Sequence, residues 1–197
     1  CEALGARFES LTFGQQVHGD SVHVLEASEA GRESFEEGLP STDGVIVREA
    51  GIAIGVFVAD CVPLLIYDPG KHAAAAVHAG WRGTAAGIAG KAVGTMAEAC
   101  GARPDSPVAA IGPAIGPCCY QVSEEVARAV GVAERRERKW YADLAEANRR
   151  QLLAAGVREE NIELSAICTA CHADEFFSER RLGRPTGRFA AFIRVVG

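Results

Sequence analysis

The chain of 197 residues carries a formal net charge of −6 at pH 7, and 48% of its residues are hydrophobic. This length suits one domain with a substantial core, which we expect over residues 1–197. The acidic balance excludes a general attraction to nucleic acid or to an anionic membrane surface, although a local basic pocket could still hold a small anion. The longest apolar stretch, residues 52–67, contains Asp60 and Pro63 and is too short to span a bilayer.

The cysteines are the most informative part of the composition. There are seven of them, an odd number at irregular spacing, in a chain too large to need disulfide bonds for stability. This pattern favours free thiols or metal ligands in a reducing compartment. No secretory signal pattern is recognisable, so we expect a cytoplasmic protein.

The first predicted elements are strands. A loop over residues 26–41 leads to the turn Thr42-Asp43-Gly44, and apolar runs then predict strands at residues 45–47, 52–58, 62–67 and 73–78. These runs are nearly continuous rather than alternating, which is typical of a central sheet covered on both faces.

Helices are predicted further along the chain. One is expected to begin near Thr84, because apolar residues recur every four positions between Ile88 and Cys100. Others are predicted after Ser123 and over residues 143–155, with strands in "SPVAAIG", "IELSAICT" and "RFAAFIRVVG". We therefore expect an α/β (α+β) fold, with a mixed central sheet and helices packed on both faces.

Three residues that close or precede strands lie beside turn residues: His18 in "QQVHGD", Cys61 in "VADCVP" and His78 in "VHAGWRG". Strand ends next to glycine or proline can aim side chains into one pocket. Two imidazoles and a thiolate would give zinc three ligands and leave a fourth position open, and the same donors suit copper. Alternatively, Cys61 and His78 are a thiol nucleophile and its base, or ordinary core residues.

A candidate phosphate site follows His78. Arg82 lies in the predicted turn before the helix, where unpaired backbone N–H groups and a partial positive charge attract anions. Gly83 would let the backbone approach phosphate closely, and Thr84 would begin the helix. The alternative is that Arg82 only packs over Trp81.

Three charged residues are further candidates. Asp43 and Asp60 could serve in acid–base chemistry or orient a histidine ligand through its second nitrogen. Asp43 is equally suited to be only the turn former of "TDG". Arg188, after "PTG", could bind phosphate or pair with a surface carboxylate.

Two further cysteine motifs have no evident partner. Cys118 and Cys119 are adjacent in a Gly/Pro-rich loop, which is not a metal-ligand spacing. Cys168-x-x-Cys171-His172 matches the c-type haem attachment pattern, but we expect no haem because this protein shows no export signal. The pair Cys168 and Cys171 could be half of a zinc site, yet no second C-x-x-C completes it.

The motifs "QQVHGD", "TDGVIV", "VADCVPLLIYDP", "AVHAGWRGT", "IGPAIGPCCYQV" and "CTACHADEFFSERRLGRPTGR" occur in the order found in the YfiH-like family, also called the laccase-domain or peptidoglycan-editing-factor family. The resemblance covers essentially the whole chain. It implies a three-layer, CNF-toxin-like fold and a zinc ion held by His18, Cys61 and His78. The family's usual N-terminal segment is expected to be absent, and Glu179 and Phe189 depart from the family pattern.

The resemblance further implies a purine nucleoside phosphorylase that acts on adenosine, inosine or methylthioadenosine, with adenosine deamination as a second activity. Cys61, His78, Arg82 and Asp43 would then be the catalytic residues. The expected partners are small molecules, a purine nucleoside and phosphate, and the expected state is a monomer or weak homodimer.

Three alternatives stay open. The first is a copper-dependent polyphenol oxidase, although five histidines are too few for a multicopper centre. The second is a cysteine hydrolase that uses Cys61 and His78. The third is a non-enzymatic role or the editing of peptidoglycan precursors.

Overall fold

The fold is built on a central mixed sheet. The computed structural model describes residues 11–31 and 37–196, so part of the loop predicted at residues 26–41 lies outside the described residues. The central sheet has six strands in the order β11-β7-β5-β6-β3-β2. Its strands in chain order are β2 (Val22–Val24), β3 (Gly44–Val47), β5 (Val62–Asp68), β6 (Ala73–Ala79), β7 (Val108–Ile111) and β11 (Ile162–Leu164). The four inner strands pair antiparallel, and the outer strands β2 and β11 pair parallel to their neighbours.

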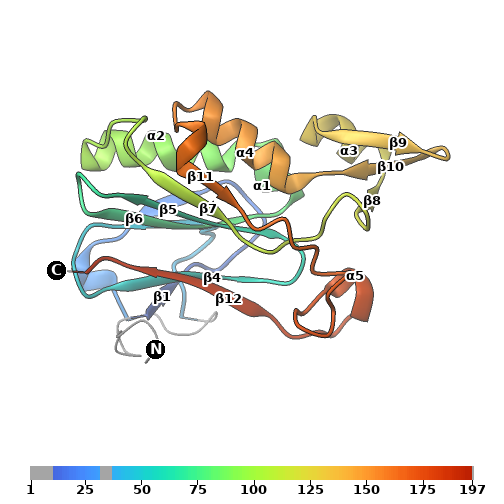
Figure 1. The fold of residues 1–197 in the computed structure, drawn as a ribbon. Coiled ribbons are helices and arrows are strands. Elements are labelled where there is room, and N and C mark those ends of the chain that lie inside the picture. The colour runs from blue at the N-terminus through green and yellow to red at the C-terminus, as the bar shows by residue number, and fades with distance from the viewer. Residues whose placement is uncertain (1–10, 32–36, 197) are drawn as a thin grey trace.

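Helices cover one face of this sheet. α2 (Ile88–Cys100) and α4 (Leu144–Ala154) lie above it in Figure 1, with the short helix α1 (Trp81–Ala85) near the middle and α3 (Glu124–Val130) toward one end. Ala73, Ala75 and Val77 of β6 face α2 across a fully buried core, which includes Ile88 and Met96. The apolar residues at helical spacing therefore form the predicted buried stripe.

A second sheet covers the opposite face. It consists of β1 (Leu11–Phe13), β4 (Ala53–Val58) and β12 (Phe189–Arg194), in the order β1-β4-β12. Its residues Ile54 and Val56 pack against Ala74 and Ala76 of β6. The predicted mixed α/β class and three layers are confirmed. The expectation of helices on both faces is wrong for the described residues, because continuous apolar runs show that both faces are buried but not what buries them.

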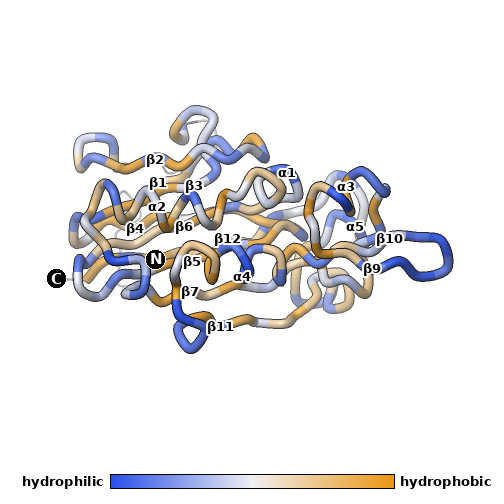
Figure 2. Tube along the Cα trace, turned by 90° about the horizontal axis from the view of Figure 1, so that it is seen from above, coloured by the Kyte–Doolittle hydropathy of each residue, from blue (hydrophilic) through white to orange (hydrophobic). Residues whose placement is uncertain are grey.

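A small third sheet extends from one end of the molecule. Its strands β8 (Gln121–Val122), β9 (Ala133–Arg136) and β10 (Lys139–Ala142) pair in the order β8-β10-β9. Figure 2 shows the turn between β9 and β10 as hydrophilic, whereas the central strands are hydrophobic. The remaining elements are the 3-10 helices η3 (Ala27–Glu29) and η4 (Glu159–Asn161) and the short α5 (Glu179–Leu182).

The helix termini follow the sequence signals. The Ser123 side chain accepts a hydrogen bond from Val126 N at the start of α3, and the Asp143 side chain accepts one from Glu146 N at the start of α4. Gly101 ends α2 in the left-handed conformation. Among the described residues, no helix is both long and apolar enough to cross a bilayer.

Glu146 provides a test of the electrostatics of α4. Its carboxylate pairs with Arg149 at 2.7 Å and with Arg150 at 2.8 Å, and these hydrogen bonds lower the pKa of Glu146 from 4.5 to about 2. Because the folded-state pKa is the lower one, this pairing stabilises the fold above about pH 4.5, and its contribution is lost as the pH falls toward 2.

We expect Glu146→Gln to lower the free energy of unfolding at pH 7 by about 1 kcal/mol, a value reduced for partial exposure. The variant should also lose less stability than the wild type below pH 4.5. Urea unfolding at several pH values measures both effects, with the exposed Glu98→Gln on α2 as the control. If Glu146→Gln lost as much unfolding free energy below pH 4.5 as the wild type, the role of this pairing would be contradicted.

Candidate functional site

The three predicted ligands come together at one end of the inner strands β5 and β6 of the central sheet. The ligand atoms of His18, Cys61 and His78 all lie within 4.8 Å of one another. His18 comes from the loop between β1 and β2, Cys61 directly precedes β5, and His78 is the penultimate residue of β6. The His18 and His78 rings meet edge to face, with centroids 4.8 Å apart.

Strand register explains the meeting of Cys61 and His78. In the antiparallel β5–β6 pair, Pro63 lies opposite His78 and Val62 opposite Ala79, which places Cys61 across from Gly80. A Cβ atom on Gly80 would lie 2.9 Å from His18 Cδ2 and 3.3 Å from Cys61 Sγ. Only glycine at this position leaves room for the cluster.

Asp43 organises the other side of the site. It directly precedes β3, whose register places it opposite His78, and His78 N donates to Asp43 O at 2.7 Å. The carboxylate accepts a 2.8 Å hydrogen bond from His78 Nδ1, and both side chains are almost fully buried. Since Nδ1 is hydrogen-bonded to Asp43, Nε2 is the ring nitrogen of His78 that is left to bind a metal ion. Asp43 therefore orients a histidine, which was one of its three sequence interpretations.

The same carboxylate fixes the loop that carries His18. Asp43 accepts backbone hydrogen bonds from Val17 N at 3.2 Å, His18 N at 3.0 Å and Gly19 N at 2.8 Å. His18 has a φ of 61°, a left-handed conformation that is uncommon for a residue with a side chain. One buried carboxylate thus positions both histidines.

The electrostatics of the cluster favour a negatively charged Cys61 thiolate beside a positively charged His78. Burial alone would raise the pKa of Cys61, but hydrogen bonds with His18 and His78 lower it to about 7. Burial alone would lower the pKa of His78, but Asp43 and the Cys61 thiolate raise it to about 9. The pKa of Asp43 is lowered because the hydrogen bonds from His78 and Gly19 N outweigh the effect of burial. The thiol is therefore easily deprotonated near neutral pH.

This donor set fits a metal ion. One thiolate and two imidazoles are ligands that zinc and copper accept, and the Asp43–His78 hydrogen bond is the kind of outer contact that holds a metal-binding histidine in place. The structure thus gives these residues a common metal-binding geometry, while the ligand types alone do not select the metal.

Asp60 has a different role from Asp43. Its carboxylate accepts hydrogen bonds from Thr169 Oγ1 at 2.7 Å and from Arg180 N at 2.7 Å. Its φ is 89°, and its backbone carbonyl accepts a bond from Ile115 N at 2.9 Å. Asp60 therefore fixes the turn that presents Cys61 rather than orienting a histidine.

Two of the predicted phosphate residues, Gly83 and Thr84, already have structural roles. The helix predicted to begin near Thr84 is α2, which begins at Ile88, and the separate short helix α1 contains Thr84. Thr84 N already donates to Gly80 O. The buried Thr84 hydroxyl accepts a 2.9 Å bond from Asn148 Nδ2, so it ties α1 to α4. A Cβ on Gly83 would lie 2.5 Å from Gly19 O, so this glycine serves the packing of the His18 loop.

The two predicted arginines are both exposed. The Arg82 guanidinium stacks over the Trp81 ring, 4.4 Å from its centroid. Arg188 lies 3.5 Å from a carboxylate oxygen of Glu179 and donates to the carbonyls of Thr186 and Gly187. Arg188 thus makes the surface carboxylate pairing that was its alternative interpretation.

Sequence reasoning gave no role to Tyr120 and Arg180, which also belong to this region. Burial and the negative charges of Cys61 and Asp60 raise the pKa of Tyr120 to about 12, against the opposing charges of Arg180 and Arg82. The Arg180 guanidinium lies 5.3 Å from the Tyr120 ring centroid. Both residues stand in quoted motifs, but nothing in their spacing indicated that they meet beside Cys61.

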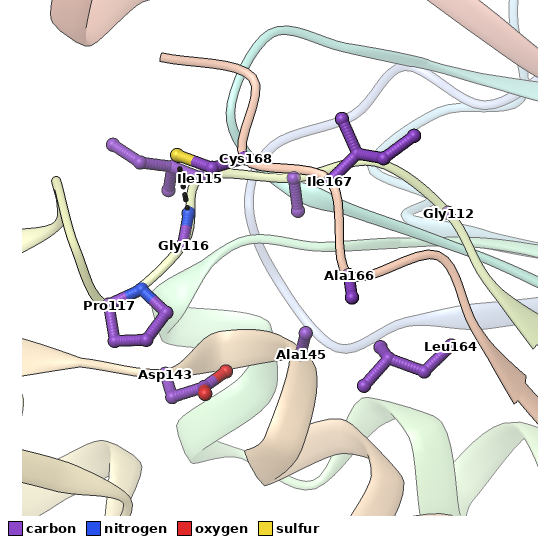
Figure 3. Close-up of a pocket in the computed structure, with 11 residues that line it drawn as sticks. Gly112, Ile115, Gly116, Pro117, Asp143, Ala145, Leu164, Ala166, Ile167 and Cys168 are labelled. Atoms are coloured by element: carbon purple, nitrogen blue, oxygen red, sulfur yellow. Dashed lines mark hydrogen bonds between the residues drawn. The ribbon is translucent and has the colours of Figure 1, made fainter. Parts of the chain in front are cut away.

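A pocket of about 160 Å³ lies close to this region but does not contain the three ligands. Figure 3 shows its walls, which come from the loop after β7, from the end of β11 with the loop that follows it, and from the start of α4. Its lining is mainly apolar, with Asp143 as the acidic residue and Cys168 as the thiol.

Comparison with known proteins identifies the family. The sequence profile of the family described as "Multi-copper polyphenol oxidoreductase laccase" matches residues 1–196. The chain belongs to this family. Purine nucleoside phosphorylase YlmD of Geobacillus stearothermophilus is 40% identical over 204 residues, which cover 98% of this chain and 74% of the relative. Adenosine deaminase RL5, from an unknown prokaryotic organism, is 37% identical and covers 94% of this chain and 75% of the relative.

A solved structure extends the family match to the fold. The crystal structure of YlmD from Geobacillus stearothermophilus superimposes with a TM-score of 0.93 at 38% identity, covering 100% of this chain and 77% of that chain. The family resemblance inferred from the motifs is confirmed. Because several curated relatives are named as enzymes, the chain is an enzyme of this family.

We expect Asp43→Asn to weaken metal binding by about 10–100-fold, because it removes the charged partner of His78 and weakens the acceptor of three backbone N–H groups. Competition with a chromophoric chelator measures the affinity. Asp20→Asn, which disturbs only the exposed pair with Lys91, is the control. Equal affinities for wild type and Asp43→Asn would contradict the role of Asp43.

We also expect Gly80→Ala to impair metal binding, because its Cβ would collide with the His18 ring. Gly94→Ala is the matched control, since a Cβ there meets no atom within 4 Å and alanine favours helix α2. Metal content measures the loss of binding, and thermal unfolding shows whether the fold itself is destabilised. The prediction fails if Gly80→Ala binds metal like the wild type.

Proposed function

We propose that the protein is a zinc-dependent purine nucleoside phosphorylase, which uses phosphate to cleave adenosine, inosine or methylthioadenosine into free base and sugar 1-phosphate. The observation that carries this proposal is the cluster of His18, Cys61 and His78 with the buried Asp43 behind it. Its family context supports the reaction class, since relatives that match nearly the whole chain are named purine nucleoside phosphorylases.

His18, Cys61 and His78 would hold the zinc ion. When bound, zinc would supply a Lewis acid that polarises an oxygen atom of a bound reactant. The chain's own contribution is preorganisation: Asp43 fixes both histidines, and the lowered pKa of Cys61, about 7, favours the thiolate that a metal requires.

Phosphorolysis needs an anchored anion and a protonated leaving base. A phosphate oxygen bonds to the anomeric carbon while the glycosidic C–N bond breaks, and its electron pair departs with the base, which takes up a proton. Arg82 and Arg180, the two cations whose charges act on Tyr120, are suited to hold the phosphate. Tyr120 keeps its proton at neutral pH and is suited to donate a hydrogen bond to a reactant.

Adenosine deamination is a second candidate function, favoured by the similarity to adenosine deaminase RL5. Zinc deaminases pair an activated water with a carboxylate that acts as acid and base. Asp43 and Asp60 are already engaged, the first with His78 and three backbone N–H groups, the second with Thr169 and Arg180. This engagement makes phosphorolysis the better supported main reaction.

The oxidase and hydrolase alternatives fit the site less well. A multicopper centre requires many imidazoles, whereas His23 pairs with Glu29 and His172 bonds to the Cys168 carbonyl. A cysteine hydrolase would need a free Cys61 thiolate, which is incompatible with metal ligation by the same sulfur. We further propose a cytoplasmic monomer or weak homodimer whose partners are the nucleoside and phosphate.

The assay that tests this function incubates the metal-replete protein with adenosine, with and without phosphate, and separates the products by HPLC. We expect adenine and ribose 1-phosphate only when phosphate is present. His78→Ala should reduce the rate at least about 100-fold, because it removes both a ligand and the partner of Asp43. His72→Ala, on the exposed turn before β6, is the matched control.

Two outcomes would overturn parts of the proposal. Inosine formed equally with and without phosphate, in the absence of ribose 1-phosphate, would replace phosphorolysis by deamination. Wild-type turnover in His78→Ala would contradict the assignment of the site.

A further inference from the structure

A second group of four potential ligands lies outside the site described above. The Sγ atoms of Cys118, Cys119, Cys168 and Cys171 all lie within 4.8 Å of one another. Cys118 and Cys119 come from the loop between β7 and β8, and Cys168 and Cys171 from the loop after β11. The vicinal pair is therefore the missing half of the site that the C-x-x-C motif left incomplete.

The sulfur spacing matches a tetrahedral metal site. Four sulfurs at about 2.3 Å from a central zinc ion lie about 3.8 Å from one another. Cys171 Sγ lies 3.6 Å from Cys118 Sγ and 3.5 Å from Cys119 Sγ. Small adjustments of these side chains would bring all four sulfurs to the required distance.

The backbone around the cluster is already arranged for it. Gly116 N donates to Cys168 Sγ at 3.2 Å, as Figure 3 shows, and such N–H···S contacts support thiolate ligands. A Cβ on Gly116 would lie 3.2 Å from Cys168 Cβ and 3.3 Å from Cys118 Sγ. Glycine at this position lets the two loops approach closely.

Backbone hydrogen bonds hold the two loops together. Ala114 N donates to Ile167 O at 3.2 Å, and Thr169 N donates to Ala114 O at 3.0 Å. Ala114 and Cys168 also form an isolated parallel bridge. The four cysteines are therefore brought together by the fold itself, which lowers the ordering cost of binding an ion.

We propose that Cys118, Cys119, Cys168 and Cys171 bind a structural zinc ion, distinct from the metal proposed at His18, Cys61 and His78. Four thiolates complete a tetrahedral coordination and leave no open position, which is typical of a structural rather than a catalytic zinc. Thiolate ligands also exclude magnesium and calcium, which prefer oxygen.

The proposed zinc would stabilise one side of the catalytic region. Thr169, next to Cys168, donates to Asp60, and the Asp60 carbonyl accepts from Ile115 in the other loop. Asp60 directly precedes Cys61, while Tyr120 directly follows Cys119. Joining the two loops through zinc therefore fixes both the turn that presents Cys61 and the position of Tyr120.

A disulfide is the competing use of these thiols. It would join Cys171 to either Cys118 or Cys119, and its sulfurs would have to approach from about 3.5 Å to about 2.05 Å. A disulfide uses only two of the sulfurs, whereas zinc accounts for the convergence of all four. We therefore favour zinc and treat the disulfide as an outcome of the test.

The first experiment leaves the four cysteines intact. The double variant His18→Ala/His78→Ala removes two ligands of the other site and is loaded with cobalt(II) under reducing conditions. We expect intense thiolate-to-cobalt charge-transfer absorption and a tetrahedral d–d spectrum from about one cobalt per chain. The absence of these bands in the folded, reduced double variant would overturn the proposal.

The second experiment measures zinc by elemental analysis of reduced protein reconstituted with zinc and desalted. Cys118→Ser/Cys171→Ser, at two exposed positions, should bind about one zinc fewer per chain than the wild type. Cys100→Ser, a half-buried cysteine outside both clusters, should bind as much zinc as the wild type. Equal zinc content in all three proteins would contradict the site. A disulfide of Cys171, identified by peptide mass mapping, that reforms in the presence of zinc would also contradict it.

Discussion

The buried hydrogen bond between Asp43 and His78 is the constraint on which the candidate active site depends. The pairing of β3 with β6 places the two residues opposite each other, and the same carboxylate holds the backbone of the His18 loop. Removing this charge would release both histidines at once. An unpaired carboxylate at this depth would be costly, so the fold and the site stabilise each other.

The local signals in the sequence predicted much of the central layer and of the helical layer. Continuous apolar runs indicated β3, β5 and β6 of the central sheet and also β4 of the second sheet, and the four-residue spacing indicated α2. The assembly of β1, β4 and β12 into a second sheet was not predictable, although β4 and β12 were each expected as strands, since β1 has only three residues and its partner β4 lies far along the chain. Local periodicity contains no information on which distant segment covers a buried face.

The candidate site shows the same limit. His18, Cys61 and His78 were recognisable because they flank turns and lie in family motifs, and the structure brings them together. Asp43 could be an acid–base residue, a partner of a histidine or only a turn former, until the register placed it against His78. The four-cysteine cluster was missed, because the C-C and C-x-x-C motifs are about fifty residues apart in the sequence. Only the folded structure shows that the two loops that carry them lie side by side.

The most direct test of this account is a crystal structure of the purified protein with anomalous diffraction data at the zinc absorption edge. The account predicts an anomalous peak bound by His18, by Cys61 Sγ and by His78 Nε2, with His78 Nδ1 still bonded to Asp43. Coordination through His78 Nδ1, or a fully occupied metal elsewhere with these three residues unligated, would contradict it.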